Sequence, residues 1–166
     1  MILEILPNKG FKIHTDIFNW NEDRKIVRQK LKNKHKEEDE TIEVSQFFDG
    51  DTSHNIEQKR DVYQNISEEK SYSFLNYNKN NQLQELEVHW GIKIKINKIE
   101  MEFGKNITSY LNQLNSQGYE FKEIEEGNYL IKELKIVIAN AEAMGADGNG
   151  FSYIFTSQDI EHLIKD

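Results

Sequence analysis

The spacing of apolar residues along the chain follows two periods, and each change of period marks a predicted element. Apolar residues at every second position predict half-buried strands. Such runs flank the turn sequences Pro7-Asn8-Lys9-Gly10 and Asn78-Lys79-Asn80-Asn81, which predicts two hairpins. The longest run crosses Gly91, where a bulge is expected. Its inward positions are Val88, Trp90, Ile92, Ile94 and Ile96.

Two segments switch to helical spacing, in which apolar residues recur every three to four positions. Asn21 is the predicted N-cap of the first helix, and Gly118 is predicted to end the second. Ser157 is the predicted cap of a short C-terminal helix that carries Ile160 and Leu163. The apolar stripes are Ile26, Val27 and Leu31 in the first helix and Ile107, Tyr110, Leu111 and Leu114 in the second.

Together these elements predict an α+β fold, with an antiparallel sheet, two main helices on one face and a short C-terminal helix. The length of 166 residues favours one domain over residues 1–166. Four apolar positions recur at one constant shift, which allows an internal duplication of a β-α-β-meander unit with pseudo-repeats 1–90 and 91–166. The matched pairs are Phe18 with Met101, Trp20 with Phe103, Val27 with Tyr110 and Leu31 with Leu114.

Composition excludes several kinds of chemistry. With 37% hydrophobic residues, a chain of this length buries a core without cross-links. It contains no cysteine, which excludes disulfides, thiolate metal sites and a cysteine nucleophile. Residues 1–14 lack a basic region followed by a long apolar run, and no segment approaches the roughly 20 apolar residues of a membrane helix. We therefore expect a cytoplasmic protein that does not enter a membrane.

The formal net charge of -8 argues against nucleic acid as a partner, because an acidic surface repels phosphates. Such a charge has two interpretations. It increases solubility, or it attracts a basic protein partner.

The stretch "AMGADGNGFSYIF" at 143–155 combines three glycines with Asp147 and Asn149. An EF-hand calcium loop would place Gly145 and Thr156 at the first and last ligand positions, where neither supplies a carboxylate. A phosphate-binding loop requires a helix after the glycines, whereas a strand pattern follows here. The stretch therefore predicts a turn between two strands.

No other motif specifies catalysis. The five histidines are not spaced as metal ligands, and no nucleophile elbow is present. We therefore expect no metal, no cofactor and no enzymatic activity. One alternative remains, a small hydrolase built on the polar stretch 49–61. Its candidate residues are Asp49, Asp51, His54, Lys59, Arg60 and Asp61.

The segment 37–51 is the best candidate for binding a partner, since it is acidic and contains no Lys or Arg. Phe47 and Phe48 lie among its acids. Either the two rings form the centre of a docking surface, or they belong to the core and the acids solvate the loop. The candidate residues are Glu37, Glu38, Asp39, Glu40, Glu43, Phe47, Phe48, Asp49 and Asp51. A weaker candidate is the acidic group Glu120, Glu123, Glu125 and Glu126.

The local sequences "NAEAMGADGNGFSYIFTSQDIEHLI" at 140–164 and "FFDGD" at 47–51, in a small, acidic, cysteine-free chain, carry a family resemblance. The chain resembles the immunity proteins of bacterial contact-dependent growth inhibition and polymorphic toxin systems. The resemblance implies a protein that binds and neutralises a cognate toxin domain in the bacterial cytoplasm. Toxins of this class are often basic nucleases, which suits the negative charge. The alternatives are a protein-interaction or adaptor domain with another partner and the small hydrolase described above.

Overall fold

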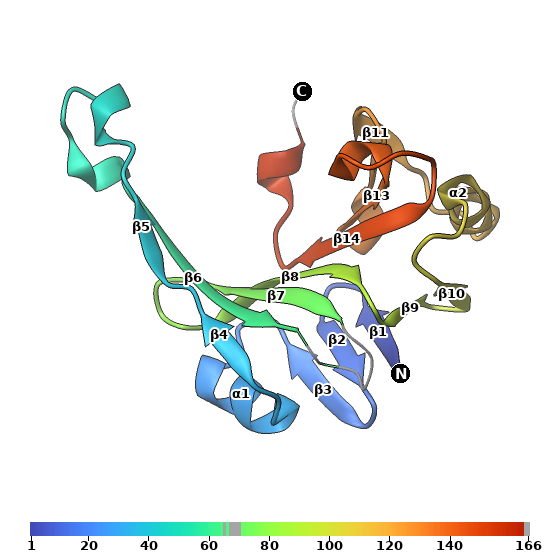
Figure 1. The fold of residues 1–166 in the computed structure, drawn as a ribbon, viewed down its shortest axis with the longest axis horizontal. Helices are drawn as coiled ribbons and strands as arrows, with labels where there is room; N and C mark the ends of the chain where they lie inside the picture. The colour runs from blue at the N-terminus through green and yellow to red at the C-terminus, as the bar shows by residue number, and fades with distance from the viewer. Residues whose placement is uncertain (65, 67–70, 165–166) are drawn as a thin grey trace.

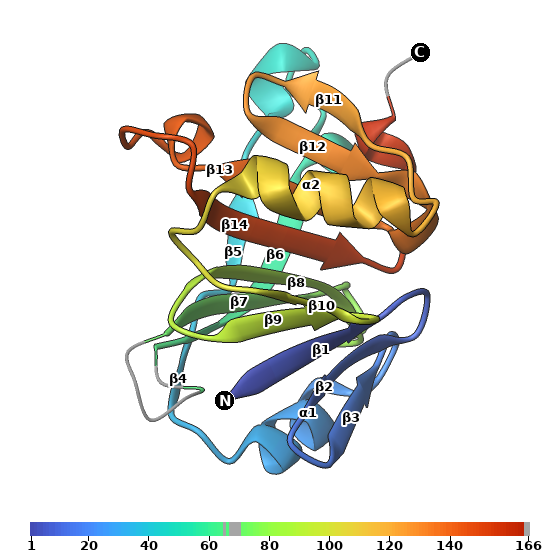
Figure 2. The same ribbon diagram turned by 90° about the vertical axis from the view of Figure 1, so that its right-hand side faces the viewer.

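Strands dominate the protein, whose computed structural model describes residues 1–64, 66 and 71–164. They form two β-sheets with the main core between them (Figures 1 and 2). The smaller sheet consists of β1 (Ile2–Leu6), β2 (Gly10–Ile13), β3 (Asp16–Asn19), β9 (Lys93–Ile96) and β10 (Ile99–Met101). The larger sheet consists of β4 (His35–Glu37), β5 (Glu40–Ile42), β6 (Ile56–Tyr63), β7 (Tyr72–Tyr77), β8 (Leu83–Trp90), β11 (Lys122–Glu125), β12 (Asn128–Ile131), β13 (Ile136–Asn140) and β14 (Phe151–Ser157).

The described residues also form two α-helices and several 3₁₀ turns. The α-helices are α1 (Arg24–Leu31) and α2 (Ile107–Ser116). The 3₁₀ turns are η1 (Ser45–Phe47), η2 (Thr52–His54), η3 (Lys132–Leu134), η4 (Glu142–Met144) and η5 (Glu161–Leu163).

In the described residues the chain passes between the two sheets three times: from β3 through α1 to β4, from β8 directly to β9, and from β10 through α2 to β11. The smaller sheet has the order β10-β9-β1-β2-β3, and the larger has the order β11-β12-β13-β14-β8-β7-β6-β4, with β5 paired to β6. β8 lies at the centre of the larger sheet, and β9 follows it in the smaller sheet. Gly91, with φ 85°, stands between them. The expected irregularity at Gly91 is therefore the place where the chain passes directly from a strand of the larger sheet to a strand of the smaller one.

The predicted fold class is wrong. The expected α+β fold had one antiparallel sheet, two main helices on one face and a short C-terminal helix. The structure is mostly β, with 45% of residues in strands and 21% in helices, and its strands form two sheets in which β1 and β9 run parallel. α1 and α2 lie far apart in the molecule (Figures 1 and 2). The apolar stripes in the sequence correctly predicted where both α-helices form, but a stripe does not specify the sheet against which the helix packs.

The C-terminal segment packs on a sheet instead of forming an α-helix. The hydroxyl of Ser157 donates to the carbonyl oxygen of Asp159 (2.7 Å) and accepts from its backbone N–H (3.1 Å), so it closes a local turn. In the described part of the chain after β14, the helical structure is limited to η5. The apolar residues expected on a helical stripe pack instead on the outer side of the larger sheet. This cluster contains Ile160, Leu163, Ile164, Leu130, Val137 and Phe155.

Alternation along the strands separates the core from the solvent. In β1, Leu3 and Ile5 are buried in the core shared by both sheets, whereas Glu4 faces outward and pairs with Lys95 at 3.1 Å. The same parity continues in β9, where Ile94 and Ile96 are fully buried. Burial of these aliphatic side chains provides the main stabilising free energy, at roughly 25 cal/mol for each Å² of apolar area.

Side-chain caps fix the start of both helices. The carboxylate of Asp23 accepts from the backbone N–H of Lys25 at 2.8 Å, and the amide of Asn106 accepts from that of Thr108 at 2.8 Å. The N-cap of the first helix is therefore Asp23, two residues after the predicted N-cap, Asn21.

The order of elements in the described residues repeats. The order β-β-β-α-β-β-β-β runs from β1 to β7 and again from β8 to β14. The shift that pairs Phe18 with Met101 also places β2 on β9, the cap Asp23 on the cap Asn106, and β3 on β10. Sheet membership breaks the correspondence, because β1 and β8 lie in different sheets. The internal duplication remains a prediction, and the element order would place its boundary at β8 rather than after residue 90.

The glycine-rich stretch connects β13 to β14 through η4 and a turn, and these two strands are antiparallel neighbours. The predicted turn is confirmed. Its end is tied to the loop before α2, since the N–H of Phe151 donates to the carbonyl oxygen of Lys105 at 2.7 Å.

Replacement of Gly10 by alanine is expected to destabilise the fold by more than about 3 kcal/mol. Gly10 has φ 140°, and an added Cβ would overlap the carbonyl oxygen of Phe18 on β3. The control is Gly118→Ala, where φ is 88° but the Cβ meets open space, at an expected cost of about 1–2 kcal/mol. Urea denaturation measures both values. Equal losses would contradict the close approach of β2 and β3.

Candidate partner-binding surface

A buried ionic cluster joins α1 to the inner side of the larger sheet. Arg24, the first residue of α1, is 5% exposed, and Asp61 on β6 is 0% exposed. The Nε and Nη2 of Arg24 donate to Asp61 at 3.1 and 2.6 Å, and the Nε of Arg28 donates to the other carboxylate oxygen at 2.8 Å. Two guanidinium groups therefore neutralise one buried carboxylate.

Arg24 also holds Asp39, which connects β4 to β5. Its Nη1 and Nη2 each donate to one carboxylate oxygen of Asp39 at 2.8 Å, the bidentate geometry in which arginine binds carboxylates most strongly. The backbone N–H of Arg60 adds a further bond to Asp39 at 3.2 Å. The ionic cluster, defined as Arg24, Arg28, Asp39 and Asp61, thus fixes the point where β5 leaves the body of the protein.

The cluster remains ionised at neutral pH. Burial disfavours the charged form of Asp61, but hydrogen bonds from Arg28 and Arg24 outweigh it and hold the pKa of Asp61 below its ordinary value of 3.8. The hydrogen bond from Arg24 likewise lowers the pKa of Asp39. Burial also disfavours the charge of Arg24, yet its bonds to Asp39 and Asp61 raise its pKa.

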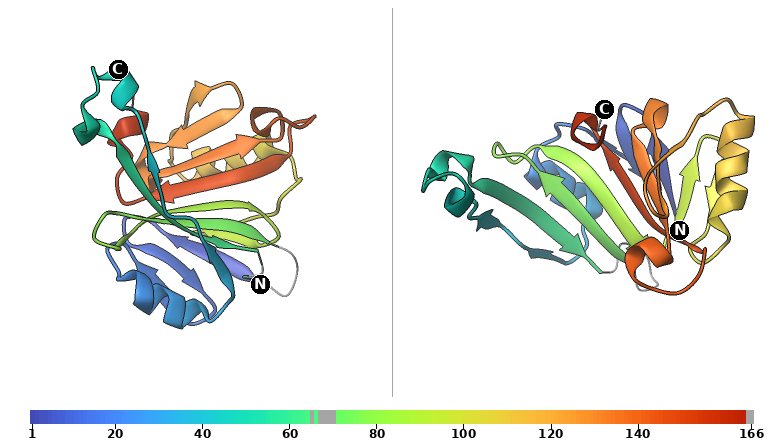
Figure 3. Two further views of the ribbon diagram at one scale, coloured as in Figure 1. Left: turned by 60° about the vertical axis from the view of Figure 1, so that its left-hand side comes forward. Right: turned by 90° about the horizontal axis from the view of Figure 1, so that it is seen from above.

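Residues 40–58, called the arm below, extend away from the body (Figures 1 and 3). The arm contains β5, η1, η2 and the start of β6, and β5 pairs with β6 from Glu40 opposite Gln58 to Ile42 opposite Ile56. Four large apolar side chains of the arm are exposed. They are Phe47 (75% exposed), Ile56 (55%), Phe48 (46%) and Ile42 (40%). The alternative that Phe47 and Phe48 belong to the core is therefore wrong.

The predicted acidic residues divide into two groups. Glu37 and Glu38 pair with Arg28 and Lys36 at 2.6 and 2.7 Å, and Asp39 belongs to the ionic cluster. Asp51 caps η2 through the backbone N–H of Ser53. By contrast, within the described part of the chain, three of the predicted acidic residues make no ion pair. They are Glu40, Glu43 and Asp49. Glu57, which lies on the arm outside the predicted segment, is also exposed and makes no ion pair in the described residues. These carboxylates supply most of the charge that the arm presents to solvent.

The structure does not bring the polar stretch 49–61 together as one site. Asp49 and Asp51 lie on the arm, whereas Asp61 is buried beneath α1. Arg60 points to the other side of the sheet, where its Nε donates to Asn76 at 2.8 Å. His54 stacks on Phe48 with ring centroids 4.2 Å apart.

A second polar group, which sequence patterns did not identify, lies on the outer side of the larger sheet. Glu87 on β8 accepts from Asn76 at 2.8 Å and from the hydroxyl of Tyr153 at 3.2 Å, and it pairs with Arg60 at 3.4 Å. The sequence does contain a signal for part of this group, because alternation along β8 places Glu85, Glu87 and His89 on one side of the strand. The sequence does not show that Arg60, Asn76 and Tyr153 lie beside them, since that depends on the pairing of four strands.

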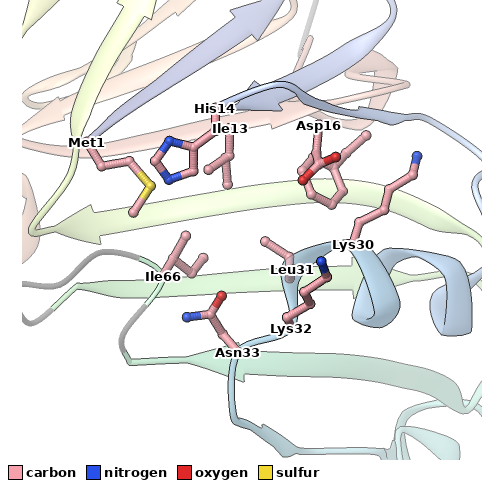
Figure 4. A pocket seen from close by; sticks show the side chains of 10 residues that line it. Met1, Ile13, His14, Asp16, Lys30, Leu31, Lys32, Asn33 and Ile66 are labelled. Carbon is pink, nitrogen blue, oxygen red and sulfur yellow. The ribbon is translucent and has the colours of Figure 1, made fainter.

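A hollow of about 420 Å³ lies between α1 and the smaller sheet (Figure 4). His14, Asp16, Lys30 and Lys32 contribute polar groups to its lining. The ammonium of Lys30 is already held by Glu22 and by the carbonyl oxygen of Ile17. The hollow is therefore a weaker candidate than the arm.

No protein-family model, curated protein or solved structure matches this chain. Among the described residues, no three His, Asp or Glu side chains converge as metal ligands. Neither described α-helix is long and apolar enough to cross a membrane.

Replacement of Asp61 by alanine is expected to destabilise the protein by about 3–5 kcal/mol, because it leaves two guanidinium groups beside an empty buried position. The control is Glu38→Ala, which removes a largely exposed pair and is expected to cost less than about 1 kcal/mol. Chemical denaturation at pH 7 compares the two. A similar small loss in both variants would show that the cluster contributes little.

The stability of the protein is expected to fall as the pH falls below about 5. The pKa values of Asp61 and Asp39 are lower in the folded protein than their ordinary 3.8, so the unfolded chain binds more protons in this range. Their contribution is complete above the unfolded pKa and is lost as the pH falls toward the folded one. Melting temperatures between pH 7 and 3 should decline less steeply for Asp61→Asn than for the unaltered protein. Parallel curves would contradict this assignment.

Proposed function

We propose that this protein is a non-enzymatic inhibitor of the immunity type, which binds and neutralises a cognate basic toxin domain in the bacterial cytoplasm. The arm is its docking surface. One observation carries the proposal: Phe47 is 75% exposed, among carboxylates that make no ion pair in the described residues.

Aromatic rings surrounded by charged groups suit a tight protein interface. Burial of Phe47 against a partner would contribute about 2–3 kcal/mol. An inhibitor that keeps a toxin at very low free concentration requires nanomolar affinity, about -12 kcal/mol. Exposed aromatic anchors supply much of such an affinity, and surrounding charges accelerate encounter.

The charge of the arm selects the kind of partner. In the described residues its carboxylates without an ion pair are Glu40, Glu43, Asp49 and Glu57, and the whole chain carries -8. A second copy of this chain would bring like charges together, whereas a basic protein complements them. The ionic cluster holds the base of the arm through Asp39, so the surface is already positioned before the partner binds.

An adaptor domain that binds a different partner would use the same arm. An immunity protein is expected to have a large secreted protein with a variable C-terminal toxin domain encoded immediately upstream, and co-expression with that domain distinguishes the two functions. Growth rescue together with a complex on a sizing column is expected for an immunity protein. Absence of both rescue and complex would overturn the proposal.

Replacement of Phe47 by alanine is expected to weaken the complex by about 30-fold or more, because an anchor of the interface is lost. Phe121→Ala is the matched control, since Phe121 is also an exposed phenylalanine (39%) but does not belong to the arm. Titration calorimetry measures both, and urea denaturation checks that both variants remain folded. Equal affinity of Phe47→Ala and the unaltered protein would exclude the arm.

The triple variant Glu40→Gln, Glu43→Gln, Asp49→Asn is expected to slow association and to reduce its dependence on salt. Its control is Glu120→Gln, Glu125→Gln, Glu126→Gln, which removes the same charge from the weaker acidic candidate. Stopped-flow association at two ionic strengths compares them. If the control slowed association more than the triple variant of the arm, the docking surface would be at the Gly127 turn and not on the arm.

A further inference from the structure

The outer side of the larger sheet is covered over one part and partly exposed over another. Over β12–β14, the C-terminal segment packs on it through Ile160 and Leu163. Over β7 and β8, the outward side chains remain partly exposed, and Trp90 at the end of β8 is 49% exposed. The outward side chains of this part, called the outer face below, are partly exposed except for Trp90, which is exposed; they are Arg60, Tyr72, Phe74, Asn76, Glu85, Glu87, His89 and Trp90.

The charges in the middle of the outer face are paired internally, although the buried Nε2 of His89 has no hydrogen-bond partner in the described residues. Glu87 interacts with Arg60, Asn76 and Tyr153, and the Nε2 of His89 lies 3.8 Å from it. Burial opposes the charge of Glu87, but its contacts with His89 and Asn76 hold its pKa below the ordinary value. Arg60 in turn lies over the ring of Phe74, 4.5 Å from its centroid. These contacts fix the side chains in place and leave little charge in the centre.

The two ends of the outer face differ from its centre. Glu85 accepts a hydrogen bond from Asn76 at 2.9 Å through Oε2, and in the described residues it makes no ion pair. At the other end, Trp90 stacks on Tyr72 with ring centroids 4.9 Å apart and planes inclined by 10°. The two ends are about 17 Å apart along β8, at the usual rise of an extended strand.

Both ends favour a cationic side chain. A carboxylate with an unused oxygen forms an ion pair with Lys or Arg, and the face of a half-exposed indole attracts the same groups by cation–π interaction. The outer face is also continuous with the arm, because β6 carries Ile56 in the arm and Arg60 in the face. Figure 1 shows the arm and η5 on either side of this part of the sheet.

We infer that the outer face is a second docking region for the same basic partner. An extended basic segment of the partner lies along β8, with one Lys or Arg side chain on Glu85 and another on the Tyr72–Trp90 stack. This inference rests on the proposed function and deepens it, since it assigns the partner two contact regions instead of one.

Trp90 itself reports on the contact. The chain has two tryptophans, and Trp20 is 9% exposed. Acrylamide quenching of the unaltered protein therefore reports mainly on Trp90. Binding of the upstream-encoded toxin domain is expected to reduce this quenching. Unchanged quenching in a complex shown to form by gel filtration would overturn the inference.

Two variants test the ends separately. Trp90→Ala and Glu85→Gln are each expected to weaken the complex by about tenfold or more. Glu100→Gln, at an exposed position on β10 of the other sheet, is the control for charge and is expected to leave affinity unchanged. Each variant combined with Phe47→Ala should show additive losses, because Phe47 shares no hydrogen bond or ring contact with Trp90 or Glu85 among the described residues.

The outcomes separate this inference from the proposed function. Loss of affinity in Phe47→Ala but not in Trp90→Ala or Glu85→Gln would overturn the second region and leave the arm as the docking surface. Absence of any complex with the unaltered chain would overturn both. Weakening by Glu100→Gln as strong as that by Glu85→Gln would show a general charge effect and would also overturn the inference.

Discussion

The pairing of Arg24 and Arg28 with Asp61 is the interaction on which the arrangement of this protein depends. A carboxylate with no exposed surface requires compensation of its charge, and α1 supplies two guanidinium groups from one side. The same Arg24 reaches Asp39 at the base of the arm. Attachment of the helix, burial of β6 and the direction of the arm are therefore consequences of a single group of charges.

The distribution of charge separates structural acids from those that are available to a partner. Asp39 lies near the start of the acidic segment and is bound internally, whereas Glu40 beside it makes no ion pair in the described residues. The outer face shows the same division between Glu87, which is surrounded by donors, and Glu85. In both places a carboxylate that is bound within the protein lies close to one that makes no ion pair in the described residues. The internally bound carboxylates, Asp39 and Glu87, therefore fix the position of the carboxylates proposed to bind the partner, Glu40 and Glu85.

Most local patterns of the sequence were reliable, and the assembly inferred from them was not. The turn at Gly10, the hairpin of β7 and β8, and both α-helices appear in the structure. Two predicted inward positions are wrong, because Ile26 is 44% exposed and Trp90 is 49% exposed. The expected C-terminal helix does not, because Ile160 and its neighbours bury their side chains on a sheet that the sequence does not reveal. The exposure of Phe47 was equally inaccessible, since a pair of aromatic residues in an acidic segment fits a core as well as a surface.

The sequence by itself determined where both α-helices and the main hairpin turns form, because backbone preference and the period of apolar residues act over a few neighbouring positions. It also determined the absence of cysteine chemistry and the sign of the surface charge. Only the tertiary structure decided which acids are neutralised, since Arg24 and Asp61 are distant in the chain and meet through the pairing of β6 and the packing of α1. It likewise decided that β8 and β9 belong to different sheets, because strand pairing depends on contacts between segments that no local pattern records.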